Sequence, residues 1–442
     1  MKLLNYNMYK NLKYILTAFI AAVALLPAKA QVTTESPYSA YGLGNLRTSV
    51  FPGLRGMGGI SAGVFKPDGY SMINVVNPAT YSGINLTTID IGVNGGFTGL
   101  KRGNESESRF NATLNHIALG IPVSRKSAFS FGLLPYSDLG YNYSNRSRID
   151  TMNVDYIYAG EGSISKAYFG YGVQFGKYVR IGANLEYLFG NLSQTRSALF
   201  PDEPAVLPSR MQNKISIDGL NFSYGIQTEI PLSEESRITL GYSGSFNSNI
   251  SAKKSYVLTQ YTVDGDGVEN PPLDTLQIID NAKTDLKLPL EHNFGFSVQR
   301  DNKWMVGADF RMGQWSKFSL DNSNQGLQDS YGVSVGGQIT PDITAVGGSL
   351  AGYLKRIDYR LGVRYDKTYL KLANNDIKDR AISVGFGFPL PSNNRLSFYK
   401  VNFTTELGRR GTTAANLVQE TYLNIHLGFT LNDTWFRRFK FD

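Results

Sequence analysis

The chain contains three histidines, and histidine is the side chain best suited to proton transfer and metal binding near neutral pH. His116, His292 and His426 fall on separate predicted strands, with no neighbouring acid and nucleophile in a catalytic pattern. His426 is expected on the polar side of its strand, where a hydrogen-bonding role is favoured over a metal or catalytic one. We therefore predict that the protein is not an enzyme and has no cofactor and no metal site.

Two acidic patterns could also do chemistry. Asp264-Gly265-Asp266-Gly267 resembles a calcium-binding turn, but it lacks a bidentate Glu at the required spacing, which favours an ordinary acidic loop. Asp309 with Arg311, and Asp358 with Arg360, lie two residues apart on one face of predicted strands. We interpret both pairs as a charge ladder that satisfies a polar interior, in preference to a proton relay.

Residues 1–30 have the pattern of a secretory signal peptide. A basic start is followed by an apolar run at 15–26 and by the small-x-small site Ala28-Lys29-Ala30. The run is short for a membrane-spanning helix, so an N-terminal anchor is the weaker alternative. We expect cleavage before Gln31, and no Cys follows that could carry a lipid anchor.

Charge and composition narrow the class of protein. The formal charge of +8 falls to +4 without the leader, which holds four lysines and no acid. No clustered basic face is present, so nucleic acid is not an expected partner. Cysteine is absent, whereas Gly (46), Tyr (27) and Phe (25) are abundant. This composition favours strands, and an exported chain without disulfides needs another stabilising device, such as a closed hydrogen-bonded sheet.

Apolar and polar residues alternate strictly along many segments after the leader. In 423–431, Leu, Ile and Phe alternate with Asn, His, Gly and Thr, and 357–366 and 179–190 follow the same pattern. Alternation over about 9–11 residues suits a tilted strand that crosses a bilayer, with lipid on one side and a polar lumen on the other. No apolar run after the leader is long enough for a spanning helix, which leaves a closed barrel.

Fourteen such segments can be counted, and their connections alternate in length. The connections at 98–108, 144–160 and 256–284 are long and polar, whereas those between them are mostly tight turns. Short periplasmic turns and longer surface loops are typical of outer-membrane barrels. The connection at 340–353 is the exception, which we interpret as a larger periplasmic loop. The fold class predicted is all-β: a transmembrane antiparallel β-barrel of about 14 strands at 85–442.

Residues 31–84 do not alternate and are rich in Gly and Pro. They also carry apolar side chains such as Leu43, Met57 and Phe65, which gives the segment material to bury. We therefore predict an N-terminal hatch that folds into the barrel as a plug. A flexible periplasmic tail is the alternative.

The chain resembles the FadL-type outer-membrane transporters of fatty acids and aromatic hydrocarbons. The resemblance rests on Arg55-x-x-Gly58-Gly59, Asp68 and Asn77-Pro78-Ala79 ahead of the first strand. It is supported by Tyr187-Leu188-Phe189-Gly190, by 408–412 and by Asn432-Asp433-x-Trp435-Phe436. The resemblance implies a fourteen-stranded barrel closed by an N-terminal hatch, with Arg55, Gly58, Gly59, Asp68, Asn77, Pro78 and Ala79 in hatch and ligand gating.

The resemblance also implies that ligand leaves sideways, through a gap made by a kinked third strand. The third predicted strand, 126–143, contains Pro135, which cannot donate to the strand ladder. We predict that Pro135 marks a lateral opening. A bulge that only adjusts curvature is the alternative.

The sequence thus predicts an outer-membrane channel of a diderm bacterium for hydrophobic small molecules, such as long-chain fatty acids or aromatic hydrocarbons. The expected partners are the lipid bilayer, the ligand and the outer-membrane assembly machinery. The ending Phe439-Lys440-Phe441-Asp442 departs from the terminal aromatic residue of many barrels. A scaffold barrel that binds a protein partner, similar to the FadL-like component of type IX secretion, is the alternative.

Overall fold

A computed structural model describes residues 36–203, 205–264, 269–345, 349–391 and 397–434. The expected signal peptide, most of the acidic turn at 264–267 and the C-terminal residues from Trp435 onward lie outside these ranges. Within the described ranges, no helix is long and apolar enough to cross a membrane.

One antiparallel sheet closes on itself, because β18 pairs with β2 from Gln419–Lys101 to Asp433–Thr87. Three wall strands are each interrupted into two pieces, β8 and β9, β10 and β11, and β12 and β13, so the wall has fourteen strands. The predicted barrel and its strand number are confirmed. The bounds are β2 (Thr87–Arg102), β3 (Glu105–Ser124), β4 (Ser127–Ile149), β5 (Met152–Phe175), β6 (Val179–Leu199), β7 (Ser209–Pro231), β8 (Ser236–Ser245), β9 (Asn249–Gln260), β10 (Asp274–Lys287), β11 (Glu291–Arg300), β12 (Trp304–Gly313), β13 (Ser319–Leu320), β14 (Ser330–Ile339), β15 (Asp358–Leu372), β16 (Asn375–Leu390), β17 (Phe398–Gly411) and β18 (Gln419–Asp433).

The alternation in the sequence becomes alternation in exposure. On β18, Leu423 and Phe429 point outward and are 37% and 38% exposed, whereas Glu420, His426 and Thr430 are buried inside. An outward apolar surface with a polar interior reverses the arrangement of a water-soluble sandwich and suits a barrel surrounded by lipid. The closed ladder also satisfies the backbone hydrogen bonds that lipid cannot accept or donate.

The polar connections are shorter than predicted. Most of 98–108 and 144–160 is strand, and the hairpin turns occupy only 103–104 and 150–151. Polar side chains do not stop pairing, because each arm of a hairpin satisfies the backbone of the other arm beyond the bilayer. The connection at 340–353 runs into a short helix, α3 (Leu350–Lys355), whose first turn is capped by the Ser349 side chain.

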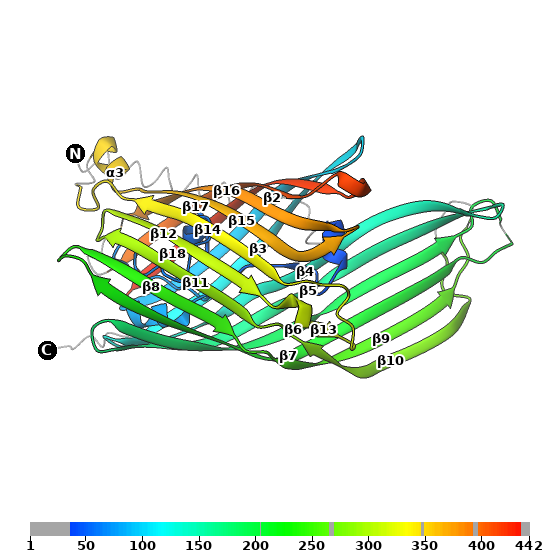
Figure 1. Ribbon diagram of the computed structural model, residues 1–442, viewed down its shortest axis with the longest axis horizontal. Coiled ribbons are helices and arrows are strands. Elements are labelled where there is room, and N and C mark those ends of the chain that lie inside the picture. The colour runs from blue at the N-terminus through cyan, green and yellow to red at the C-terminus, as the bar shows by residue number, and fades with distance from the viewer. Residues whose placement is uncertain (1–35, 204, 265–268, 346–348, 392–396, 435–442) are drawn as a thin grey trace. The chain divides into compact units, whose positions relative to one another are not determined.

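The wall is much taller on one side than on the other. β4, β5, β6 and β7 contain 21 to 24 residues each, whereas β11, β12 and β14 contain 10. Together with β9 and β10, the long strands form a six-stranded extension that we call the wing (Figure 1). At about 3.3 Å per residue, strands of this length exceed what a bilayer needs.

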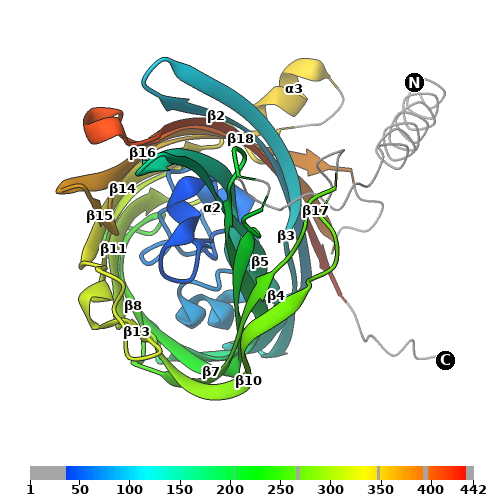
Figure 2. The same ribbon diagram turned by 90° about the vertical axis from the view of Figure 1, so that its right-hand side faces the viewer.

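The described part of the hatch lies inside the ring of strands (Figure 2). It contains the 3-10 turns η1 (Pro37–Ala40) and η2 (Pro78–Gly83), the two-residue strand β1 (Asn45–Leu46) and the short helix α2 (Pro52–Arg55). Its apolar residues are buried, including Leu43, Met57 and Ile60 at 1% exposure or less. The lumen is therefore filled by packed chain.

The hatch backbone rests directly on glycines of the wall. A Cβ atom on Gly241 would lie 1.8 Å from the carbonyl oxygen of Ala62, and one on Gly362 would lie 2.0 Å from the backbone nitrogen of Gly58. Any other residue at these positions would overlap the hatch. We call the wall glycines that contact hatch backbone the glycine girdle: Gly172, Gly182, Gly241, Gly295, Gly336, Gly362 and Gly385.

Replacing a girdle residue by a larger one should loosen the hatch. Gly241→Val is expected to destabilise the folded barrel by about 1–3 kcal/mol, because overpacking forces backbone to move. Thermal unfolding in detergent measures this loss. Gly99→Val is the matched control, since a Cβ atom there meets only a carbonyl oxygen of Thr421 at 3.7 Å. Equal stability of the two variants would contradict the role of the girdle.

Candidate functional site

The predicted residues Asn77, Pro78 and Ala79 hold the hatch in place. The Asn77 side chain donates to the carbonyl oxygen of Ala62 (2.8 Å) and accepts from the backbone N–H of Ala79 (3.2 Å), which caps η2. Pro78 is buried, and its backbone lies against Gly172 and Gly182 of the girdle. These three residues are thus buried where the hatch lies against β5 and β6.

Arg55, Gly58 and Gly59 lie at the end of α2. Gly58 (φ 72°) and Gly59 (φ 83°) take the left-handed conformation that glycine favours, and the Gly58 N–H donates to the Ser383 hydroxyl (2.9 Å). Arg55 bonds to Thr48, and its guanidinium lies 3.6 Å from Glu406. Burial lowers the pKa of Arg55, and the carboxylate of Glu406 opposes that shift.

Asp68 joins a charge network between the hatch and the wall. It contacts the Lys400 ammonium, which also binds Asp358 (2.5 Å). Arg360 donates to Asp358 (2.8 Å) and to Asn402 (2.7 Å). The predicted pairing of Asp358 with Arg360 therefore forms, and it is extended by a hatch carboxylate that the strand pattern alone could not place there.

The other predicted pair, Asp309 with Arg311, does not form. Asp309 accepts hydrogen bonds from the backbone N–H groups of Ser61 (2.7 Å) and Ala62 (2.9 Å) in the hatch. Arg311 pairs instead with Asp366 (2.9 Å) on another strand. The prediction was wrong because the hatch offers Asp309 two buried donors that need an acceptor.

Residues 59–63, Gly-Ile-Ser-Ala-Gly, match the spacing of the nucleophile elbow of esterases. Ser61 is buried in the hatch, 3.2 Å from Asp309, and Asn293 lies 3.5 Å from its hydroxyl. An elbow requires a strand–turn–helix context and a histidine base. The contacts of Ser61 in the described residues include neither.

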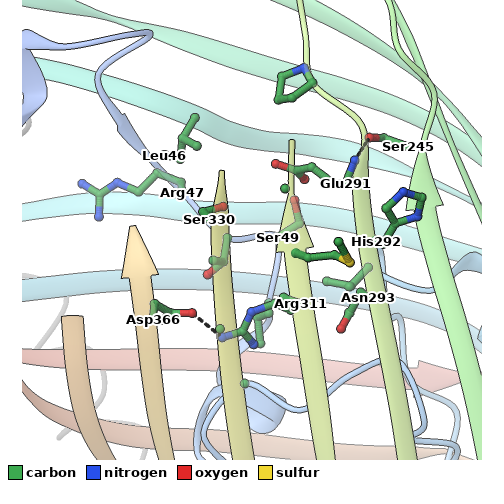
Figure 3. A pocket seen from close by; sticks show the side chains of 18 of the residues that line it. Leu46, Arg47, Ser49, Ser245, Glu291, His292, Asn293, Arg311, Ser330 and Asp366 are labelled. Atoms are coloured by element: carbon green, nitrogen blue, oxygen red, sulfur yellow. Dashed lines mark hydrogen bonds and ion pairs between the residues drawn. The ribbon is translucent and has the colours of Figure 1, made fainter. Parts of the chain in front are cut away.

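A cavity of about 370 Å³ lies between the hatch and the wall (Figure 3). Leu46, Arg47 and Ser49 of the hatch face Glu291, Arg311 and Asp366 of the wall across it (Figure 3). Of the seven predicted hatch residues, only Gly59 is among its described lining residues. Most of the side chains that surround the cavity were therefore not among the residues singled out from the sequence.

The lining contains both charged and apolar side chains. Besides His292, its Arg, Lys, Asp and Glu residues are Arg47, Lys166, Arg311, Arg364, Lys367 and Arg410 with Glu186, Glu291, Asp366 and Asp379. Six cations and four carboxylates leave a formal excess of +2. Apolar surface comes from Tyr136, Leu288, Trp315 and Tyr369. The cavity is thus amphipathic.

Lys166 is a lining cation whose carboxylate partner, among the described residues, is Glu186. Its ammonium group donates to Ser49 of the hatch (2.9 Å) and lies 3.2 Å from Glu186. Glu186 also accepts from Asn221 (2.8 Å) and Ser223 (3.0 Å), so its charge is satisfied by several groups. Inward-facing charge on an alternating strand is the signal by which the sequence could have suggested Lys166 and Glu186.

The seam between β3 and β4 is paired over only part of its length. Pairing runs from Ser124–Ser127 to Ile117–Leu133 and then stops. Residues 105–116 of β3 pair with β2 alone, and Pro135 follows the last paired residue of β4 by two positions. On the opposite side, β4 pairs with β5 past Pro135 with a register shift before Ser137. The unpaired seam and the proline therefore coincide.

The hatch occupies the β4 edge beside this seam. Asn45 and Leu46 pair with Asp138 and Ser137, and the Arg47 N–H donates to the carbonyl oxygen of Tyr136 (2.8 Å). The hatch therefore supplies backbone partners to β4 just beyond Pro135, and the described β3–β4 ladder does not extend to this part of the seam. Since Leu46 and Arg47 also line the cavity, β1 lies between the cavity and the seam.

An aromatic stack lies next to the point where pairing between β3 and β4 begins. The ring of Phe51 in the hatch stacks on His116 of β3 at 3.6 Å between centroids. His116 also bonds to Asp90 (2.6 Å), which fixes its ring. These contacts hold the hatch against the last residues of β3 before pairing with β4 begins.

The closed fourteen-strand wall with an internal N-terminal segment defines the class of the fold, that of the FadL-type channels. The chain is similar to the solved structure of the Pseudomonas putida toluene transporter TodX, with 14% identity and a TM-score of 0.57 over 88% of this chain and 99% of that one. It is also similar to a Pseudomonas aeruginosa FadL homologue, with 11% identity and a TM-score of 0.56 over 88% and 99%. The Ralstonia pickettii toluene transporter TbuX is also similar (14%, 0.54, 87% and 98%).

A family model gives the particular assignment. The BamG family model matches residues 8–442, and the chain belongs to the BamG family. The FadL-type resemblance seen in the sequence is therefore correct for the fold, while the family carries a different name. No curated protein sequence matches the chain significantly.

Proposed function

We propose that the protein is a passive outer-membrane channel for small molecules with an apolar body and an anionic end, such as fatty acids. The observation that supports this most is the amphipathic cavity next to the unpaired β3–β4 seam. The similar solved structures include hydrocarbon and toluene channels, which support a hydrophobic ligand.

The charge of the cavity favours an acid over a neutral hydrocarbon. The lining cations Lys166, Arg311 and Arg364 already have carboxylate partners in the protein, and a ligand carboxylate could add a charge-assisted contact that a neutral hydrocarbon cannot make. A carboxylate can bind Lys166 or the arginines, while its chain contacts Trp315 and Tyr369. The formal excess of +2 is consistent with one bound anion.

The seam offers the exit. Ligand in the cavity would reach the bilayer sideways if β1 moved off β4, because β1 is the hatch element between the two. On this proposal Pro135 keeps the strand edge free of pairing, and Arg55, Gly58, Gly59, Asp68, Asn77, Pro78 and Ala79 hold the rest of the hatch still. Cleavage of residues 1–30 and export to the outer membrane belong to the same proposal.

Binding of a matched acid and alcohol tests the cavity. Wild type in nanodiscs should bind decanoate more tightly than decanol, as measured by the change in intrinsic tryptophan fluorescence, to which Trp315 of the cavity contributes. Lys166→Gln should weaken decanoate about tenfold, the value of one charge-assisted hydrogen bond, and leave decanol unchanged. Lys254→Gln removes an equal charge from an exposed pair with Asp321 (2.6 Å) and should change neither. Equal effects on decanoate and decanol would contradict an acid-binding site.

A scaffold role is the second candidate, and it rests on the wing. Residues 274–284 of β10 pair with β9 on one side only among the described strands, and Leu276 and Ile278 are 52% and 66% exposed. A free edge with apolar side chains can add a partner strand. The family name BamG points to the outer-membrane assembly machinery. Slow hydrogen exchange of β10 amides only in the presence of such a partner would favour this role.

A further inference from the structure

A second hollow, of about 420 Å³, lies on the outer side of the wall near the tops of β15–β18. It is flanked by the β15–β16 turn, where Ala373 (φ 45°) and Asn374 (φ 62°) both adopt positive φ. Lys378, Arg380 and Arg409 supply its cations, and Asp376 is the single acid among its described lining residues. The hollow therefore carries a local positive charge.

These cations sit at the border of the outward apolar surface. Arg380 and Arg409 are direct register partners on β16 and β17, and both are exposed. Two residues further down the same strands, Ile382 and Leu407 are partners and are 55% and 57% exposed. At about 3.3 Å per residue, the cation pair lies about 7 Å above the apolar pair. A polar head and an apolar chain could occupy this surface together.

The charges in the hollow are not neutralised by the protein. Asp376 pairs with Lys367 (3.3 Å) and accepts from Gln328 (2.9 Å). Across the described ranges, no carboxylate forms an ion pair with Lys378, Arg380 or Arg409; the Arg380 guanidinium lies over the Tyr365 ring at 5.6 Å. Like charges directly opposite each other on neighbouring strands repel. A bound anion would remove that repulsion.

We propose that this hollow binds the phosphate groups of a bisphosphorylated, multiply acylated lipid of the lipid A type. Arginine pairs bind phosphate with directed hydrogen bonds, and cations at a membrane interface attract anionic lipid. The acyl chains lie over Ile382 and Leu407, within the apolar surface. More than one negative charge is needed to match three cations. The site rests on the membrane placement proposed above and is independent of the lumen cavity.

Native mass spectrometry of the detergent-purified full barrel tests the site. Bisphosphorylated lipid A should stay bound under conditions that remove phosphatidylglycerol, and inorganic phosphate should not displace it. The triple variant Lys378→Gln/Arg380→Gln/Arg409→Gln should lower lipid A affinity by about tenfold or more. All three side chains are exposed, so the barrel should fold as wild type does.

A matched control removes the same charge elsewhere. Lys253→Gln/Lys283→Gln/Lys287→Gln changes three exposed lysines of β9 and β10 and should keep lipid A affinity. Equal loss in both variants, unchanged binding in the first, or displacement by inorganic phosphate would overturn the proposal. Decanoate binding should be unaffected by the first variant, and Lys166→Gln should leave lipid A bound. Failure of the channel and failure of the lipid site are therefore distinguishable.

Discussion

Passage of ligand should stop when β1 is fixed to β4 by a disulfide in the Leu46→Cys/Ser137→Cys variant. Leu46 and Ser137 are register partners, and the neighbouring pair Arg47–Tyr136 is hydrogen-bonded through its backbone. Because hydrogen-bonded and non-hydrogen-bonded pairs alternate along an antiparallel ladder, Leu46 and Ser137 form a non-hydrogen-bonded pair, in which the Cα atoms are closer together. Such a pair falls within the Cα separation that a disulfide spans. The chain has no other cysteine to compete. Because β1 separates the cavity from the seam, fixing it should close the lateral route.

Uptake of labelled decanoate by a diderm host that makes the variant measures the effect. Under oxidising conditions the rate should fall about tenfold or more, to that of cells without the barrel, and reductant should restore it. The single variants Leu46→Cys and Ser137→Cys control for the substitutions themselves. An oxidised double variant that transports as fast as the reduced one would show that β1 is not the gate.

Loss of Asp309 should turn the closed barrel into a leaky pore. Its carboxylate is the acceptor for the N–H groups of Ser61 and Ala62, and Asp309→Ala leaves both donors buried without it. Charge-assisted hydrogen bonds contribute about 1.5–3 kcal/mol each, so the hatch should lose several kcal/mol of its attachment. Single-channel conductance in planar bilayers should then show large, frequent openings that wild type lacks.

Asp309→Asn provides the control for this experiment. The amide oxygen can still accept from both N–H groups, so the openings should be rare again, although the negative charge is gone. If the alanine and asparagine variants leak equally, the charge and not the hydrogen bonds holds the hatch. If neither variant leaks, the glycine girdle and Asn77 are enough to hold the hatch without Asp309.

The period-2 pattern was enough to predict the wall, because side chains on a strand must alternate between lipid and lumen whatever their neighbours are. The hairpin lengths were not predictable in the same way, since 144–160 pairs through backbone groups that polar side chains do not reveal. Pro135 could be singled out because proline alone lacks the N–H. The sequence also suggested a hatch, through glycine density combined with residues such as Leu43 and Met57.

The cavity was harder to predict than the wall. Lys166 and Glu186 face each other because β5 and β6 pair in one register, and alternation does not specify register between strands. The two-residue spacing predicted that Asp309 pairs with Arg311. In the structure Asp309 instead accepts a hydrogen bond from the buried backbone N–H of Ser61 in the hatch. Motif positions such as Asn77 and Gly58 identified where the hatch is anchored, and the side chains around the cavity come from strands far apart in sequence.

The glycine girdle has a consequence for how the chain folds. The girdle glycines lie on strands from β5 to β16, and the hatch precedes all of them in the sequence. The hydrogen bonds between hatch and wall therefore join residues far apart in the chain: 325 residues separate Gly58 from Ser383, and 248 separate Ser61 from Asp309. Contacts of such separation form late, because loop-closure entropy opposes them until the intervening chain is in place. A chain cut before β16 would lack Gly385, the Ser383 acceptor of Gly58 and a closed wall, so residues 36–84 would stay accessible to proteases until the last strands are in place.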